Sequence, residues 1–154
     1  MEPSLVRFLQ RPAMIIVGTA DGNGRPAIAR GISVWTQPDT ERVTVIVSRW
    51  QWPDTVANVG RSERAAVTFS RPSTYETYQI KGPAQVREMT DRDGDVMQTY
   101  GREIATTLIE LGIEPPSIAH WYCTEDPLAI DLTAEAIFLQ TPGPGAGGRI
   151  GGAA

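Results

Sequence analysis

The segment from Arg42 to Phe69 contains the residues whose types and spacing best fit a binding function. A β-branched run, Val43–Ser48, ends in a serine followed by Arg49, and a helix-forming stretch, Asp54–Gly60, begins soon after it. A hydroxyl and a guanidinium beside a helix N-terminus can bind an anion, because free backbone N–H groups and the positive end of the helix dipole point to the same place. We therefore predict a site for a phosphate-bearing cofactor here, although an ordinary strand exit would contain the same dipeptide.

Few other side chains of the chain are suited to catalysis. The single histidine, His120, and the single cysteine, Cys123, are too few for a histidine-and-cysteine metal cluster, so we predict no metal site. We interpret His120 as a packed or half-exposed residue rather than a base, and Cys123 as a small buried residue rather than a nucleophile. Residues 143–148 match the glycine spacing of a dinucleotide site, but no helix follows them, so we reject that match.

The strand predicted over residues 25–36 has one face of small side chains and one face of larger ones. The expected alternation puts Ile28, Arg30, Ile32 and Val34 on one face, and Ala27, Ala29, Gly31 and Ser33 on the other. The small face would let either a flat cofactor ring or a tightly packed neighbouring strand approach the backbone. Arg30, in the middle of this strand, would either bind a carboxylate or phosphate or face solvent at an edge.

The elements that must position these residues are mostly strands. Alternating or β-branched runs predict strands over residues 13–20, 25–36, 43–48, 65–69, 75–87 and 128–140. Thr90 and Asp93 have the spacing of a capping box at the start of one long helix, and Pro115 begins a further helical turn. This pattern predicts a mainly β fold with minor α, a six-stranded antiparallel barrel. We expect one domain over residues 1–140, followed by a loose Gly/Pro-rich tail over 141–154.

Composition limits the classes of partner. A net charge of −4 argues against a nucleic-acid surface, which would carry a basic excess. No apolar stretch has the length that a bilayer-crossing helix needs, so no membrane partner is expected. The first residues lack the basic and long apolar regions of a signal peptide, and one cysteine gives no disulfide framework. We expect a cytoplasmic protein.

Four segments taken together resemble the pyridoxamine 5′-phosphate oxidase-like family. They are, in chain order, RPAIARGISVWT, RVTVIVSRWQW, DTVANVGRSERAAVTFS and YETYQIKGPAQVRE. The similarity covers roughly residues 8–90 in order, and the late helix and last strand fit the same plan. The resemblance implies an FMN-binding split barrel that forms a homodimer, with two FMN sites at the subunit interface.

The resemblance also implies which residues would bind FMN. They come from the second strand beside the flavin ring, from the phosphate-binding segment after the third strand, and from the long fifth strand of the partner subunit. The matching positions here are Arg30, Gly31, Ile32, Ser33, Ser48, Arg49, Trp52, Thr55, Thr77 and Gln79. The well-known oxidases have an Arg-Lys pair in the phosphate segment, where this chain has Arg49 alone, so a true pyridoxamine phosphate oxidase is not expected.

Three hypotheses follow for the function. The first is an FMN-dependent oxidoreductase acting on an unidentified small molecule, in which the cofactor supplies the chemistry and no catalytic side chain is assigned. The second keeps the barrel but replaces FMN by haem or a deazaflavin. The third is a non-catalytic dimeric binding module whose pocket is filled by Trp50 and Trp52.

Overall fold

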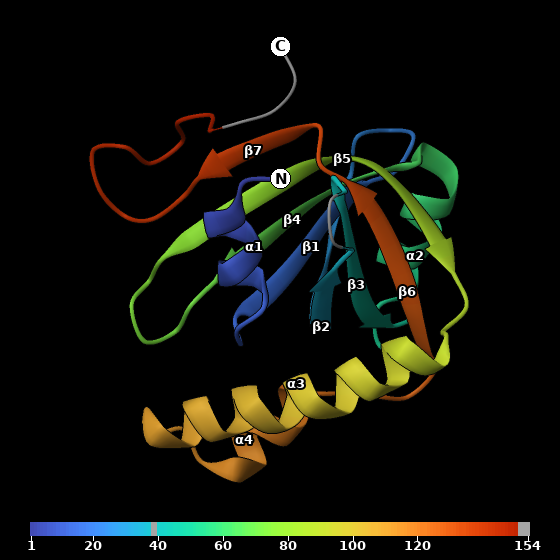
Figure 1. Cartoon of the computed structure of the whole chain (residues 1–154). Coiled ribbons are helices and arrows are strands. Elements are labelled where there is room, and N and C mark those ends of the chain that lie inside the picture. Colours follow the sequence, from blue (N-terminus) through green and yellow to red (C-terminus); the bar gives the residue numbers. More distant parts are fainter. Residues whose placement is uncertain (38–39, 151–154) are drawn as a thin grey trace.

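Six antiparallel strands close into a barrel in the computed structural model, which describes residues 1–37 and 40–150 (Figure 1). Going around the barrel, β1 pairs with β2, β2 with β3, β3 with β6, β6 with β5, β5 with β4, and β4 again with β1. The predicted mainly β fold and its six-stranded barrel are confirmed. The strands are β1 (Met14–Ala20), β2 (Pro26–Thr36), β3 (Arg42–Ser48), β4 (Arg64–Ser70), β5 (Thr77–Arg87), β6 (Pro127–Thr133) and a seventh, β7 (Ala136–Leu139).

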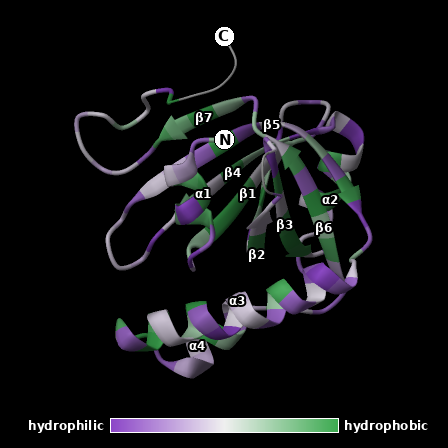
Figure 2. Ribbon diagram, in the orientation of Figure 1, coloured by the Kyte–Doolittle hydropathy of each residue, from purple (hydrophilic) through white to green (hydrophobic). Residues whose placement is uncertain are grey.

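The barrel interior is filled by one face of each strand. Because strand side chains alternate between faces, every second residue of β1, β3, β4 and β6 is buried in a single apolar core. Figure 2 shows the hydrophobic colour concentrated on these strands. The largest fully buried side chains that belong to this core are Leu9, Ile15, Phe69, Ile80, Ile104, Leu128, Ile130 and Leu132.

A β-bulge in β2 changes which side chains face outward. Gly31 pairs with Val47, but Ser33 pairs with Ile46, so Ile32 is an extra residue in the ladder. Ile32 and Ser33 consequently both point to the outer face of the barrel, while Val34 joins the interior core. The alternation expected from the sequence therefore holds through Ile32 and is wrong from Ser33 onward, because a single inserted residue reverses the face of everything that follows it.

The small-residue face of β2 is a packing feature. A Cβ built on Gly31 would lie 2.5 Å from Cγ2 of Ile15 and 3.0 Å from Cγ1 of Val45, both in the barrel interior. Ala29 on the same face is also buried in the core. Of the two explanations that the sequence left open, a tightly packed neighbouring strand is the one the structure supports.

The strand predicted over residues 128–140 is broken into β6 and β7. The first half of β5 pairs with β7 and its second half with β6, and the change of partner falls at Gly82 and Pro83. A Cβ on Gly82 would overlap the carbonyl oxygen of Thr133, so the close crossing of the two chains requires glycine. Pro83, which has no N–H to donate, lies where the ladder is interrupted on that side.

Within the described residues, four helices cover parts of the barrel. Figure 1 shows α3 and α4 together below it, with α1 and α2 on either side. Thr90 and Asp93 form the predicted capping box at the start of α3, with both reciprocal hydrogen bonds present. None of the helices in the described part of the chain is both long and apolar enough to cross a membrane. The helices are α1 (Pro3–Leu9), α2 (Pro53–Ser62), α3 (Asp91–Glu110) and α4 (Pro115–Trp121).

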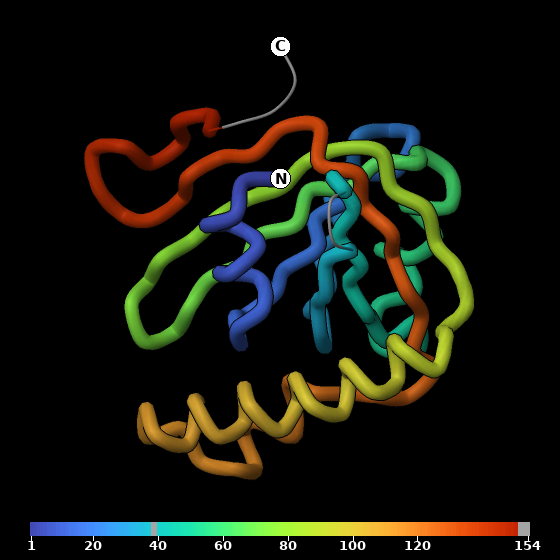
Figure 3. Tube along the Cα trace, in the orientation of Figure 1, coloured from blue at the N-terminus to red at the C-terminus, as the bar shows by residue number. Residues whose placement is uncertain are grey.

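Residues 141–150 turn back along β7, as the trace in Figure 3 shows. The Leu139 N–H donates to the Gly148 carbonyl at 2.9 Å, and the Ile150 N–H donates to the Ile137 carbonyl at 2.8 Å. These bonds join the stretch to β7, and the expectation of a loose Gly/Pro-rich tail from residue 141 stays a prediction. Its last part, residues 151–154, lies outside the described residues.

Candidate functional site

The outer face of the barrel carries a row of side chains that includes two predicted site residues. Arg30 on β2 pairs with Ile16 on β1, Ile16 pairs with Thr68 on β4, and Thr68 pairs with Gln79 on β5. Residues that pair directly across a ladder point to the same face, so all four side chains lie side by side there. The Gln79 amide donates to Thr68 Oγ1 at 3.0 Å.

Ser48 lies next to this row. Gly31 pairs with Val47, so the end of β3 lies beside the β2 position of Arg30. The hypothesis that the second strand and the segment after the third strand form one site requires this proximity. The pairing of β2 with β3 provides it within a single subunit.

The Ser48 hydroxyl shapes the turn that leads into α2. Ser48 Oγ donates to the Glu125 carbonyl at 2.6 Å and accepts from the Gln51 N–H at 3.1 Å. The Ser48 carbonyl accepts from the Trp52 N–H at 3.0 Å, one residue before the helix begins. Ser48 itself is buried, so its hydroxyl holds local structure and would reach a ligand only after losing these partners.

Arg49 is the first exposed residue after β3, and its guanidinium is paired with a carboxylate. Nε and Nη2 of Arg49 donate to the two carboxylate oxygens of Asp126 at 2.7 and 2.8 Å. The hydrogen bond from Arg49, reinforced by its charge, lowers the pKa of Asp126, and the same pair raises the pKa of Arg49. The register Ser48↔Pro127 explains the contact, because it places the residue before Pro127 beside the residue after Ser48.

The segment between α4 and β6, residues 122–126, passes over the predicted site; we call it the α4–β6 connector. At its start, the Trp121 ring lies 4.8 Å from the Arg30 guanidinium carbon in a cation–π contact. Tyr122 packs against the core, and burial raises the pKa of its hydroxyl. Together with the contacts to Ser48 and Arg49, these interactions place Trp121 and the connector against the two arginines of the predicted site.

The predicted site residues fall into two groups by exposure. Arg30, Gly31, Arg49, Trp52 and Gln79 are exposed or half-buried, whereas Ile32, Ser33, Ser48, Thr55 and Thr77 are buried. Ile32 packs with Ile46 and Ala129 in a small cluster outside the barrel, and Thr77 Oγ1 bonds to Ser70 Oγ at 2.8 Å. Of the exposed group, Arg30 and Gln79 lie in the row on the outer face, and Arg49 follows the end of β3 beside it. A binding role for each residue stays a prediction.

Two buried polar atoms of the predicted set have no protein partner. Within residues 1–37 and 40–150, the buried side-chain atoms without a hydrogen bond are Ser33 Oγ, Trp52 Nε1 and Arg71 Nε. Buried polar groups are nearly always bonded, so an unpaired one needs an explanation. Two of the three belong to residues predicted to bind the cofactor. Ser33 lies on the outer face opposite Ile46, whereas Trp52 packs against the interior core, so the two atoms are separate. A polar group of a cofactor such as FMN would satisfy either atom, and in this respect the residues present fit such a cofactor.

Trp50, which was expected to fill a pocket, and the single histidine and cysteine are more exposed than the sequence predicted. Trp50 is 63% exposed, so it does not fill a pocket, and Trp52 packs partly against the core. His120 is exposed at the end of α4, where its Nδ1 lies 2.7 Å from the Pro116 carbonyl oxygen. Cys123 is half-buried, with Sγ 3.6 Å from Ser48 Oγ, rather than fully buried.

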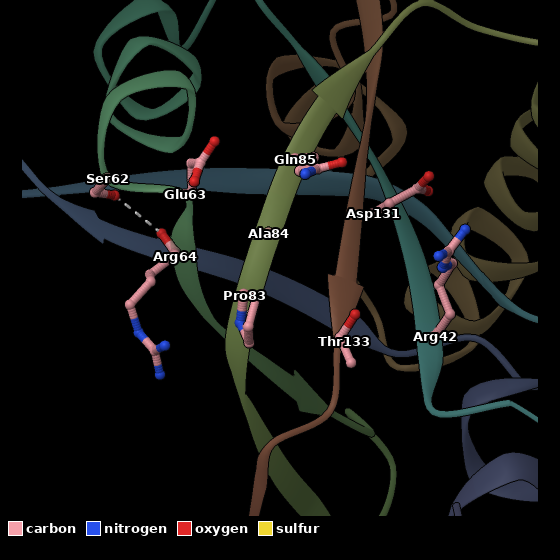
Figure 4. Close-up of a pocket in the computed structure, with 9 residues that line it drawn as sticks. All are labelled: Arg42, Ser62, Glu63, Arg64, Pro83, Ala84, Gln85, Asp131 and Thr133. Carbon is pink, nitrogen blue, oxygen red and sulfur yellow. Dashed lines mark hydrogen bonds between the residues drawn. The ribbon is translucent and has the colours of Figure 1, made fainter.

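Two of the cavities formed by the described residues bear on the site, although neither is lined by any of the ten predicted residues. One of about 450 Å³ is polar, and Figure 4 shows Ser62 and Glu63 at its α2 side and Arg42 and Asp131 at its β3 and β6 side. The other, about 530 Å³, is a shallow hollow on the outer face of β1, β2, β4 and β5 that includes Ile28. The second cavity adjoins the row that contains Arg30. Gly18 and Ile28 pair with each other and both line this cavity, and Ile28 is the residue that precedes Arg30 on the same face of β2.

A second Arg–carboxylate cluster lies at the start of α3 and has a structural role; we call Arg87, Asp93 and Asp131 the α3 clamp. Asp93 is fully buried, and its carboxylate accepts from Arg87, Thr90 and the Trp35 indole at 2.6 to 3.2 Å. Arg87 also donates to Asp131 at 3.0 Å. All the polar groups of the clamp are paired, so it ties the helix to the barrel instead of presenting reactive groups.

The contacts of Trp121 with Arg30 and of Asp126 with Arg49 were not predicted from the sequence. Trp121 and Asp126 both lie far along the chain from the strands they touch, and the Arg49–Asp126 pair spans 77 residues. The signal that would find Asp126 is the register of β3 against β6, which no local pattern specifies.

Comparisons with known proteins bear on the fold. No family model matches the chain, and no curated protein matches it. Solved structures do match over most of the chain. A pyridoxamine 5′-phosphate oxidase-related, FMN-binding protein from Nostoc punctiforme has a TM-score of 0.54 at 13% identity, covering 94% of this chain and 88% of its own.

Two further matches carry other names. HutZ, the haem storage protein from Vibrio cholerae, has a TM-score of 0.52 at 14% identity, covering 90% of this chain and 93% of its own. A protein described as an F420 reductase has a TM-score of 0.51 at 13% identity, covering 85% and 93%. At such identities the likeness concerns the fold, and the three names differ in ligand. The chain thus has the split-barrel fold of pyridoxamine 5′-phosphate oxidase-like proteins.

Proposed function

We propose that this chain is an FMN-binding flavoprotein that works as a flavin-dependent oxidoreductase on a small molecule. The observation that carries the proposal is the meeting of Arg30, Ser48 and Arg49 at one place on the outer face of the barrel, just before α2 begins. The charge of Arg49 and the hydroxyl of Ser48, shortly before a helix N-terminus, suit a phosphate. The unpaired Trp52 Nε1 and Ser33 Oγ add polar groups in the same predicted set.

Each residue has a limited task in this proposal. Arg49 binds the phosphate by charge-assisted hydrogen bonds, and Arg30 and Gln79 orient the ring from the row across β2, β1, β4 and β5. When bound, FMN supplies hydride and electron transfer, which explains why the site needs no acid–base side chains of its own. The protein contributes binding and orientation.

A homodimer is part of the proposal. Ile28 is 62% exposed on the outer face, beside the hollow of about 530 Å³. Exposed apolar surface around a hollow favours burial against another protein surface. A second copy packed there would enclose the ligand between two subunits and exclude water from it.

The test is flavin binding by a matched pair of variants. Arg49→Ala should weaken FMN binding more than about tenfold in a fluorescence titration, because it removes charge-assisted bonds to the phosphate. Arg61→Ala removes the same charge from an exposed position in the last turn of α2 and should leave the dissociation constant unchanged. Equal affinities in all three proteins would remove Arg49 from the site.

A deazaflavin is the second candidate, favoured by the likeness to the structure described as an F420 reductase. Absorption spectra of the purified protein, with mass spectrometry of the chromophore released by heat, separate the two flavin types. A Soret band would instead indicate haem, as the likeness to HutZ would suggest. A colourless protein that also ignores added FMN would favour the non-catalytic binding module.

A further inference from the structure

The α4–β6 connector provides a protein partner for each polar group that the proposed function assigns to the phosphate. The Glu125 carbonyl accepts the hydroxyl hydrogen bond of Ser48, and the Asp126 carboxylate accepts two bonds from Arg49. The Arg49 N–H donates to the Asp126 carbonyl at 2.9 Å. A phosphate that approached this place would therefore meet groups that are already bonded.

The geometry of the Arg49–Asp126 pair resembles the way a guanidinium binds an oxyanion. Nε and Nη2 form one edge of the guanidinium, and both donate to the same carboxylate. This parallel two-bond arrangement is the one that arginine also offers to phosphate. Asp126 consequently occupies the edge of Arg49 that would bind a phosphate best, and two anions cannot share it without strong repulsion.

The backbone holds Asp126 in this position. Asp126 has φ of 48°, in the left-handed region that aspartate and asparagine tolerate better than most residues. Its carbonyl is fixed by the Arg49 N–H, and the next residue, Pro127, is already in the ladder opposite Ser48. The carboxylate is thus placed by the fold. Asparagine can keep this backbone conformation while losing the charge, which makes Asp126→Asn the appropriate variant.

We propose that Asp126 determines ligand specificity by competing with a ligand phosphate for the Arg49 guanidinium, an inference that rests on the proposed flavin site. The pair is exposed, with side-chain exposures of 48% and 42%, so water and ligand both reach it. Exposed ion pairs are weakly held and exchange partners easily. A phosphorylated ligand must displace the carboxylate, whereas a ligand without phosphate leaves the pair intact. Asp126 therefore reduces the preference of the site for a phosphorylated flavin over an unphosphorylated one.

The experiment compares FMN with riboflavin, which differ by the phosphate alone. Dissociation constants are measured by flavin fluorescence titration for the full-length wild type, Asp126→Asn, Arg49→Ala and the double variant. Asp126→Asn should bind FMN about fivefold more tightly and riboflavin with unchanged affinity. The double variant should bind FMN as weakly as Arg49→Ala, because the gain needs the guanidinium. The control is Glu110→Gln, which also removes one negative charge, from an exposed position at the end of α3. It should change neither the FMN nor the riboflavin dissociation constant.

The outcomes separate this inference from the proposed function. If FMN binds the wild type but Asp126→Asn leaves the FMN-to-riboflavin ratio unchanged, the competition is wrong and the flavin site stands. An equal gain for both flavins, or a gain that persists in the double variant, also overturns it, because the effect would then be a general change of charge. If neither flavin binds any of these proteins, the proposed function fails and this inference fails with it.

Discussion

Two Arg–carboxylate clusters of this protein use the same chemistry in opposite settings. In the α3 clamp, Asp93 is fully buried and accepts hydrogen bonds from Arg87, Thr90 and Trp35. At the candidate site, Arg49 and Asp126 are both exposed, and each is the other's side-chain partner. The first cluster joins α3 to the barrel, and the second joins two loop residues at the surface.

The difference in burial explains the difference in role. Losing one partner of a buried pair leaves an uncompensated charge away from water, which costs about 3–5 kcal/mol. An exposed pair contributes little, because water replaces either partner. The clamp is therefore suited to holding the fold, while the Arg49–Asp126 pair is suited to exchanging one anion for another. A ligand site at the second cluster can change its contacts without loosening the barrel.

The largest expected effect comes from removing the buried carboxylate. Asp93→Ala should lower the free energy of unfolding by about 3 kcal/mol, because Arg87 and the Trp35 indole lose their shared acceptor. Urea denaturation followed by circular dichroism measures it. Asp95→Ala, exposed on the same helix, is the control and should change stability by less than about 0.5 kcal/mol. If Asp93→Ala does not fold, Asp93→Asn gives the same comparison, and a loss no larger than the control's would contradict a structural clamp.

The next prediction concerns pH. Burial alone would raise the pKa of Asp93, but hydrogen bonds from Arg87, Thr90 and Trp35 outweigh it and hold that pKa well below the ordinary value of 3.8. Such a carboxylate contributes stability that is present above the unfolded pKa and is lost as pH falls below it. The difference in unfolding free energy between wild type and Asp93→Asn should be constant from about pH 7 to pH 5 and shrink below about pH 4. A difference that persists unchanged at pH 3 would mean that the charge of Asp93 is not what stabilises α3.

A smaller effect is expected from the indole of the clamp. Trp35→Phe keeps an aromatic ring but removes the Nε1 hydrogen bond of 2.8 Å to Asp93. Hydrogen bonds to charged groups contribute about 1.5 kcal/mol or more, so the unfolding free energy should fall by about that amount. The pH dependence should survive, because Arg87 and Thr90 still bond to the carboxylate. An unchanged unfolding curve would show that the indole bond is not part of the clamp.

The smallest stability effect should come from the exposed pair. Arg49→Ala and Asp126→Asn should leave the urea midpoint at the wild-type value, because both side chains are solvated without each other. Thermal and urea unfolding of both variants, beside the Asp93 variants, tests this directly. A loss comparable to that of Asp93→Asn would mean that the Arg49–Asp126 pair holds the fold, and the contrast between the two clusters would be wrong.

Much of the fold could be predicted from local patterns. Alternating side chains identified the barrel strands, and the Thr90 and Asp93 spacing identified the start of α3. The proximity of Arg30 to Ser48 followed from two strands joined by a short connection, which usually pair. These features depend on neighbouring residues, and local sequence specifies them well.

The rest depended on contacts between distant residues. The bulge at Ile32 reverses the faces of β2 from Ser33 onward, and nothing in an alternating run reveals an inserted residue. Asp126 reaches Arg49 only because β6 pairs with β3. The break between β6 and β7 arises where the chain crosses Gly82, and nothing in the local sequence identifies that crossing point. Non-local register therefore decided the details of the site.

The central claim, that a flavin phosphate binds Arg49 on the outer face of the barrel, is tested most directly by a crystal structure of the protein with FMN. The account predicts the FMN phosphate within hydrogen-bonding distance of the Arg49 guanidinium, the Asp126 carboxylate displaced, and the flavin ring against the side of the barrel that carries Arg30 and Gln79. FMN in the polar cavity of Figure 4, with the Arg49–Asp126 pair intact, would contradict it.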